Sequence, residues 1–138
     1  MENELFKCVM VIADELPSGL AVNAAGVLAI TLGRRVESLV GPDVVDGSGQ
    51  LHAGLINITL PVLKADRDII KQIRMKASAL PDLLVVDLTE PAQTSRTYQD
   101  YTKRMAGLPA EELGYLAVAL YGNKKAINKL TGNLPLLR

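Results

Sequence analysis

The stretch Phe6–Ala13 reads FKCVMVIA, an apolar run that contains several β-branched residues. Such a run predicts a β-strand that is covered on both faces, as the strands of parallel sheets are. Two further stretches have the same character, DLLVVD at Asp82–Asp87 and YLAVALY at Tyr115–Tyr121. A segment with helical features follows each of the three stretches, which indicates a layered α/β fold.

The segments that follow or join these strands show the usual start and stop signals of helices. The first is rich in small residues, and the second carries apolar side chains at helical spacing. A third begins near Pro91 and places two tyrosines, Tyr98 and Tyr101, on one face. The predicted helices are 20–32, closed by Gly33; 66–79, capped by Asp66; a helix from Pro91 to about Met105; and 123–131, capped by Asn123 and stopped by Gly132.

Residues 36–60 are less regular. The turn signal Asp46-Gly47-Ser48-Gly49 predicts a hairpin. Apolar and polar residues alternate over 54–60, which predicts a strand with one less buried face. We therefore expect a single α/β domain over residues 1–138, with a mixed, mainly parallel sheet of about four to six strands flanked by helices.

The composition limits the partners and the chemistry. The chain has 138 residues, with 15 basic and 15 acidic side chains, one cysteine and one histidine. Zero net charge disfavours a nucleic-acid partner, although the segment from Lys103 to the end is basic. Cys8 has no partner for an intrachain disulfide, and Cys8 with His52 is too small a set for zinc, whereas Mg²⁺ on carboxylates stays open.

The same sequence carries no targeting or cofactor signal that we recognise. The acidic start Met1–Glu4 does not resemble a secretory signal. The longest apolar stretch is shorter than the ~20 residues of a membrane span. Gly47-Ser48-Gly49 lacks the context of a dinucleotide-binding motif. We therefore expect a cytoplasmic protein with no membrane partner, no metal and no cofactor.

Two strand-to-helix turns are candidate anion sites. One contains Ser18 and Gly19, and the other contains Gly122, Asn123 and Lys124. Free N–H groups and a partial positive charge at helix N-termini attract anions. If the first and last strands are parallel, both turns lie at the same edge of the sheet, where ligands of open α/β sheets bind. The alternative is a tight turn with ordinary solvated lysines.

Three polar residues are candidates for a site. Asp14 and Asp87 each follow or end a buried strand, where a carboxylate acts as a general base, holds a polar ligand or caps a turn. Asn23 interrupts an apolar helix, so its amide requires a partner in the crevice or in a backbone loop. Asp87 and Asn23 are the candidates for catalysis, and Asp14 and Asn23 are candidates for ligand binding.

Four other residues are interpreted as structural. Cys8 lies inside a strand and is expected in the core. His52 lies beside the predicted hairpin and is expected to be exposed. Tyr98 and Tyr101 are expected to pack on neighbouring side chains rather than to stack on a ligand.

Several motifs resemble the bacterial family of domain of unknown function 2000. They are Lys7–Val11, Leu16–Ala25, Leu39–Asp43 with Asp46-Gly47, Ala92-Gln93 with Tyr98 and Tyr101, and the closing segment Leu120–Arg138. The similarity covers nearly the whole chain, and its closing segment is the most specific part.

That family resembles, more distantly, the type II peptidyl-tRNA hydrolases. The resemblance implies a mixed sheet flanked by helices and a homodimer. Matching the first helix places Gly19 and Gly26 at the positions of the hydrolases' lysine and histidine, and Asn23 at their glutamine. Asp87 falls near their aspartate, so the amide and one carboxylate persist while the basic residues do not.

Three functions are compatible with these residues. The first is a binding or regulatory protein for a small anionic ligand held by Ser18, Asn23, Asn123 and Lys124. The second is a hydrolase of peptidyl-tRNA or a related acyl ester, which would use Asp87. The third is a structural homodimer without a ligand. Because one fold hosts many functions, the resemblance does not choose among them.

Overall fold

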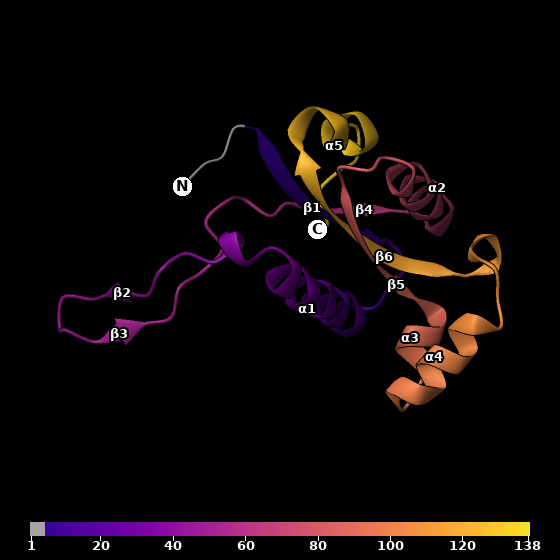
Figure 1. Cartoon of the computed structure of the whole chain (residues 1–138), viewed down its shortest axis with the longest axis horizontal. Coiled ribbons are helices and arrows are strands. Elements are labelled where there is room, and N and C mark those ends of the chain that lie inside the picture. Colours follow the sequence, from indigo (N-terminus) through magenta and orange to yellow (C-terminus); the bar gives the residue numbers. More distant parts are fainter. Residues whose placement is uncertain (1–4) are drawn as a thin grey trace.

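A four-stranded sheet forms the centre of the protein in the computed structural model, which describes residues 5–138 (Figure 1). The strand order is β4 (Val62–Ala65), β1 (Phe6–Ala13), β6 (Tyr115–Asn123) and β5 (Leu84–Thr89). The three long apolar stretches of the sequence are thus the three longest of these strands. Residues 1–4, whose composition argued against a secretory signal, lie outside the described residues.

The expectation of a mainly parallel sheet is wrong. Only β1 and β4 pair in parallel, whereas β6 is antiparallel to both of its neighbours, β1 and β5. The reason lies in the connection between β5 and β6. It stays at one end of the sheet, where the Glu90 amide donates to the Gly114 carbonyl at 2.9 Å. The chain therefore enters β6 at the end where it left β5 and runs back.

Helices cover both faces of the sheet. Helix α1 (Ser18–Arg35) covers one face, and α2 (Arg67–Ser78) and α5 (Lys124–Thr131) cover the other. The central strands β1 and β6 are buried on both faces, which explains their nearly continuous apolar sequence. Cys8 is fully buried on the α1 face, as expected.

Helix boundaries follow the sequence signals in part. Asp66 caps α2 by accepting from the Ile69 amide at 2.9 Å, as predicted. Helix α1 runs past Gly33, because glycine is tolerated inside a helix. The helix expected from Pro91 to Met105 is divided into α3 (Glu90–Thr94) and α4 (Tyr98–Ala106). The break has a local cause, since Thr97 starts a new helix by accepting from the Asp100 amide at 3.0 Å.

The predicted strand over 54–60 does not form. These residues hydrogen-bond to the short helix η1 (Glu37–Leu39) and to the residues just after it instead of joining the sheet. The Gly41 amide donates to the Leu55 carbonyl at 2.9 Å, and the Asn57 amide donates to the Leu39 carbonyl at 2.8 Å. The alternating apolar side chains pack on the α1 side of the core, which accounts for the pattern without a strand.

Residues 40–57 form an extension that we call the arm. Its outer part is the predicted hairpin, with β2 (Val44–Val45) antiparallel to β3 (Leu51–His52). The Asp46 carboxylate closes the turn by accepting from the backbone amides of Ser48 and Gln50. Figure 1 shows the arm reaching away from the sheet and its helices. It is therefore neither part of the main sheet nor a cover over it.

The two edges of the main sheet differ. The C-terminal segment covers the outer edge of β4, where the Lys64 amide donates to the Pro135 carbonyl at 3.0 Å and the Leu137 amide donates to the Val62 carbonyl at 2.9 Å. The other edge strand, β5, pairs with β6 on one side only. After α4, the short helix η2 (Ala110–Glu112) returns the chain to β6.

Candidate functional site

The two predicted anion-binding turns lie at opposite ends of the sheet. Because β1 and β6 are antiparallel, Phe6 lies opposite Asn123 and Ile12 lies opposite Ala117. The turn with Ser18 follows the far end of β1, so the length of an eight-residue strand, about 25 Å, separates it from Asn123. A single ligand held by Ser18, Asn123 and Lys124 is excluded by this geometry.

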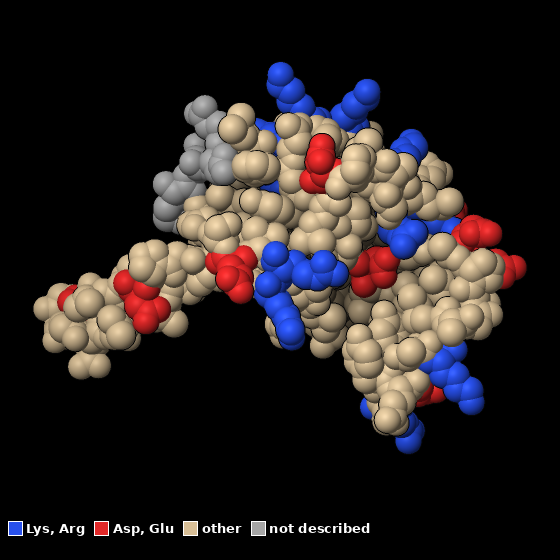
Figure 2. Space-filling view, in the orientation of Figure 1, with Lys and Arg blue, Asp and Glu red and all other residues tan. Residues whose placement is uncertain are grey.

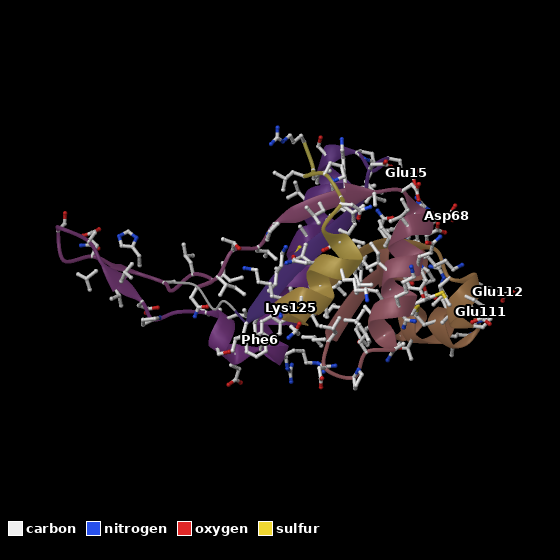
Figure 3. The ribbon with its side chains drawn as sticks, turned by 90° about the horizontal axis from the view of Figure 1, so that it is seen from above. Phe6, Glu15, Asp68, Glu111, Glu112 and Lys125 are labelled. Atoms are coloured by element: carbon white, nitrogen blue, oxygen red, sulfur yellow. The ribbon has the colours of Figure 1, made fainter. Side chains whose placement is uncertain are left out.

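Neither turn on its own is a good anion site. The residues of one have a structural role, and the other lies in an electrostatic field that is unfavourable to anions. Asn123 caps α5 by accepting from the Ala126 amide at 3.1 Å. Gly122 is buried with φ +155°, a conformation that favours glycine. Asp14, Ser18 and Gly19 are exposed at an end of the molecule that also bears Glu15, Asp68, Glu111 and Glu112 (Figure 3). Glu15 is paired with Arg67, whereas Asp68, Glu111 and Glu112 form no ion pair within the described residues and disfavour a bound anion there.

A cleft of about 430 Å³ lies between α1, the β5 strand and the α3–α4 pair, and Figure 2 shows the surface hollowed there. It brings together Asn23 and Asp87, the two candidates for catalysis, from segments that are far apart in the sequence. The lining residues are Asn23, Val27, Leu28, Thr31, Val86, Asp87, Leu88, Ala92, Gln93, Ser95, Arg96, Thr97, Tyr98 and Tyr101.

The turn between α3 and α4 is held by hydrogen bonds on both sides. Arg104 Nη1 donates to Thr94 Oγ1 at 2.8 Å and to Ser95 Oγ at 3.1 Å. Thr97 caps α4 on the other side of the turn. These contacts fix the backbone on either side of Arg96, whose guanidinium is therefore carried by an ordered part of the cleft wall.

Asp87 is paired rather than free. Arg74 Nε donates to Asp87 Oδ2 at 3.2 Å, and both side chains are partly buried. The Arg74 guanidinium also lies over the Tyr115 ring, 5.5 Å from its centre. The ion pair neutralises the Asp87 charge, so the carboxylate is already engaged and a general-base role would require it to leave Arg74.

Tyrosines form one wall of the cleft. Tyr98 and Tyr101 pack edge to face with 5.4 Å between ring centres, and both also line the cleft. Burial, the Asp87 charge and Tyr98 together raise the pKa of Tyr101 above its ordinary value. The Tyr101 hydroxyl is therefore protonated at neutral pH and is available as a hydrogen-bond donor.

The cleft combines apolar walls with a few polar groups, as small-molecule sites do. Val27, Leu28, Val86 and Leu88 supply apolar surface. Within the described residues Arg96 forms no ion pair, in contrast to Arg74. The cleft therefore offers one unpaired cation, several amide and hydroxyl groups and an apolar floor.

Sequence reasoning missed Gln93, Arg96 and Thr31. Gln93 carried one signal, its place in the Ala92-Gln93 family motif, whereas Thr31 on α1 and Arg96 in the turn between α3 and α4 meet only in the tertiary structure. His52 is exposed as expected, but it also pairs with Asp46 at 2.7 Å at the tip of the arm.

No group of three or more His, Cys, Asp and Glu residues in the described part of the chain could hold a metal ion. None of the helices within residues 5–138 is both long and apolar enough to cross a membrane.

A family model for "Protein of unknown function (DUF2000)" matches residues 6–138. The chain belongs to this family. The DUF2000 family was the one indicated by the motifs in the sequence, so that expectation is confirmed. No curated protein matches the chain.

A solved structure has the same fold as this DUF2000 protein. It is a protein of unknown function, Atu0240, from Agrobacterium tumefaciens strain C58, with a TM-score of 0.87 and 15% sequence identity. The match covers 95% of this chain and 96% of the other. At this identity the likeness shows the fold alone. The more distant resemblance to type II peptidyl-tRNA hydrolases is not confirmed by these comparisons.

Proposed function

We propose that this DUF2000 protein binds a small molecule with an anionic group and an apolar part in the cleft between α1, β5 and the α3–α4 pair. The observation that carries the proposal is the meeting of Asn23, Arg96 and Tyr101 around one apolar-floored cleft. As in the prediction from the sequence, the proposed ligand is anionic and contacts Asn23. Unlike in that prediction, it does not contact Ser18, Asn123 or Lys124.

The chemistry of the cleft defines the ligand class. Arg96 presents a guanidinium, whose planar donor fork matches carboxylate and phosphate groups. Asn23 and Gln93 supply amide donors and acceptors, and Tyr101 supplies a hydroxyl donor. Because Asp87 is paired with Arg74, its charge repels an anion less than a free carboxylate would.

A thermal-shift screen of small carboxylates and phosphates, with inorganic phosphate included, tests the proposal. A ligand at one hundred times its Kd stabilises the folded state by about 2.7 kcal/mol, which such a screen detects. We expect Arg96→Ala to abolish the stabilisation and Asn23→Ala to weaken it. Lys124→Ala, at the opposite end of the sheet, is the matched control and retains it.

Two results would reject this function. One is a panel in which no member stabilises the wild-type protein. The other is a ligand that stabilises Arg96→Ala as much as the wild type, because the cleft would then lack its proposed anchor.

The hydrolase hypothesis has one supporting observation, the location of Asp87 and Asn23 in the same cleft. In this alternative Asp87, whose carboxylate pairs with Arg74 on the α2 side of the sheet, leaves Arg74 and turns into the cleft to activate water, while Asn23 donates to the developing oxyanion. Incubation of purified protein with peptidyl-tRNA tests it. Loss of product formation in Asp87→Asn supports it, and intact substrate after prolonged incubation with the wild type rejects it for this substrate.

A further inference from the structure

The arm has no core of its own. All residues from Pro42 to Ala53 are exposed, although Val44, Val45 and Leu51 carry large apolar side chains. A two-stranded hairpin without further packing is marginal in water. In Figures 1 and 3 the arm lies away from the remainder of the molecule, so this chain does not cover its apolar side chains.

The outward face of α1 is also apolar. No charged residue occurs from Leu16 to Gly33, and Val22 and Ile30 are 72% and 77% exposed. A side chain added at Gly26, between them, would meet nothing within 4 Å. A helix face of this kind allows close approach of another backbone, whereas a solvated helix face is normally polar.

The two surfaces are continuous. A hollow of about 240 Å³ lies between the C-terminal half of α1 and the base of the arm. Every residue that lines it is apolar: Ala29, Leu32, Gly33, Leu39, Val40, Ile56 and Leu60. The exposed apolar face of α1 and the apolar surface of the arm are therefore joined by this hollow, with no polar residue lining it.

We propose that this continuous surface is the interface with a second copy of the same chain. Large apolar side chains that are more than half exposed run along it, Val22 and Ile30 on α1 and Val40, Val44, Val45, Leu51 and Leu55 on the arm; a standard interface buries ~800 Å² of each partner. Two equal patches related by a two-fold axis form a closed pair.

Charge complementarity favours a copy of this chain over an unrelated partner. The chain has no Lys or Arg between Arg35 and Lys64, so the arm carries the acidic residues Asp43 and Asp46 without a Lys or Arg, and Asp46 also pairs with His52 of the same arm. The α1 helix ends in two basic residues, Arg34 and Arg35. In a two-fold pair the acidic arm of each protomer has a basic helix end available on the other.

The interface adjoins the cleft of the proposed ligand site. Asn23 and Val27 lie on α1 and line that cleft. A second copy seated on the outward face of α1 therefore lies at the cleft mouth. The dimer proposal itself does not depend on a ligand.

The mass of the full chain in solution tests the proposal. One chain weighs 14.8 kDa, so two weigh 29.6 kDa (twice 14.8). We expect light scattering after size exclusion to give the two-chain mass for the wild type. Ile30→Glu on α1 and Leu51→Glu on the arm each raise the dimer dissociation constant at least tenfold. Met75→Glu, an exposed apolar position on α2, is the matched control and keeps the wild-type mass.

Two outcomes would overturn the proposal. The first is a wild-type protein that has the one-chain mass throughout a dilution series. The second is a dimer that survives both Ile30→Glu and Leu51→Glu. Circular dichroism of each variant separates loss of assembly from loss of folding. Leu51 is exposed on the arm and outside the main sheet, so we expect Leu51→Glu to leave the sheet intact.

Discussion

The backbone of Gly122 offers a test of how the last strand is joined to the last helix. Gly122 has φ +155°, and a Cβ added there would lie 2.5 Å from Leu83 Cδ2 and 2.9 Å from the Asp82 carbonyl oxygen. The first contact is with a side chain that can move, but the second is with backbone. We therefore expect Gly122→Ala to destabilise the fold.

The magnitude follows from three contributions. Holding a residue with a side chain in this conformation costs about 1–3 kcal/mol. Forcing an extra carbon against Leu83 and Asp82 costs about 1–3 kcal/mol more. Reduced freedom of the unfolded chain returns about 0.4–1 kcal/mol. The net loss is about 3 kcal/mol, which lowers Tm by roughly 10 °C for a chain of this size.

Gly33→Ala is the matched control, because the structure predicts that the same substitution at this position raises the free energy of unfolding instead of lowering it. Gly33 lies inside α1, and an added Cβ meets nothing within 4 Å in the same chain. Because Gly33 also lines the hollow of the proposed interface, both substitutions are made in the Ile30→Glu background. Alanine favours the helix by about 0.5–1 kcal/mol. Urea unfolding at one fixed protein concentration measures both variants, since the stability of a dimer varies with concentration. Equal midpoints for Gly122→Ala and wild type would refute the reasoning.

Three further predictions concern a thiol, a carboxylate and a helix cap. Burial raises the pKa of the Cys8 thiol from 9.0 to about 11, so its contribution to stability is present below pH 9 and is lost as pH rises toward 11. We expect the free energy of unfolding to fall by about 3 kcal/mol over this range in alkaline unfolding curves. Cys8→Ser, whose hydroxyl does not titrate, removes this dependence of stability on pH. Hydrogen bonds from His52 and two backbone amides lower the pKa of Asp46. The Asp46 carboxylate therefore stabilises the hairpin turn above pH 3.8, and this contribution is lost only as pH falls below that value. NMR shifts of Asp46 that titrate at or above pH 3.8 would contradict this. Asn123→Ala removes the cap on the Ala126 amide and is expected to cost about 1 kcal/mol in urea unfolding, whereas Asn123→Ser retains most of it.

Short-range signals determined the elements of this protein. The apolar runs at Phe6–Ala13 and Tyr115–Tyr121 are buried strands because their side chains are covered on both faces. Asp66 and Asn123 cap helices because their side chains reach amides only three residues away. The hairpin follows from the Asp46 turn in the same way. The caps and the turn depend on contacts within a few residues, whereas the strands are readable because burial on both faces leaves a continuous apolar run in the sequence.

Only the tertiary structure decided the direction of the strands and the location of the cleft. The burial pattern of β6 is the same whether its neighbours run parallel or antiparallel, so no local signal reveals that Ser18 and Asn123 lie at opposite ends. Asn23 on α1 and Arg96 in the turn between α3 and α4 meet only when α1 and the α3–α4 pair pack around β5. The direction of the strands and the location of the cleft both depend on how the connections run between the elements. Local residue patterns contain little information about those connections.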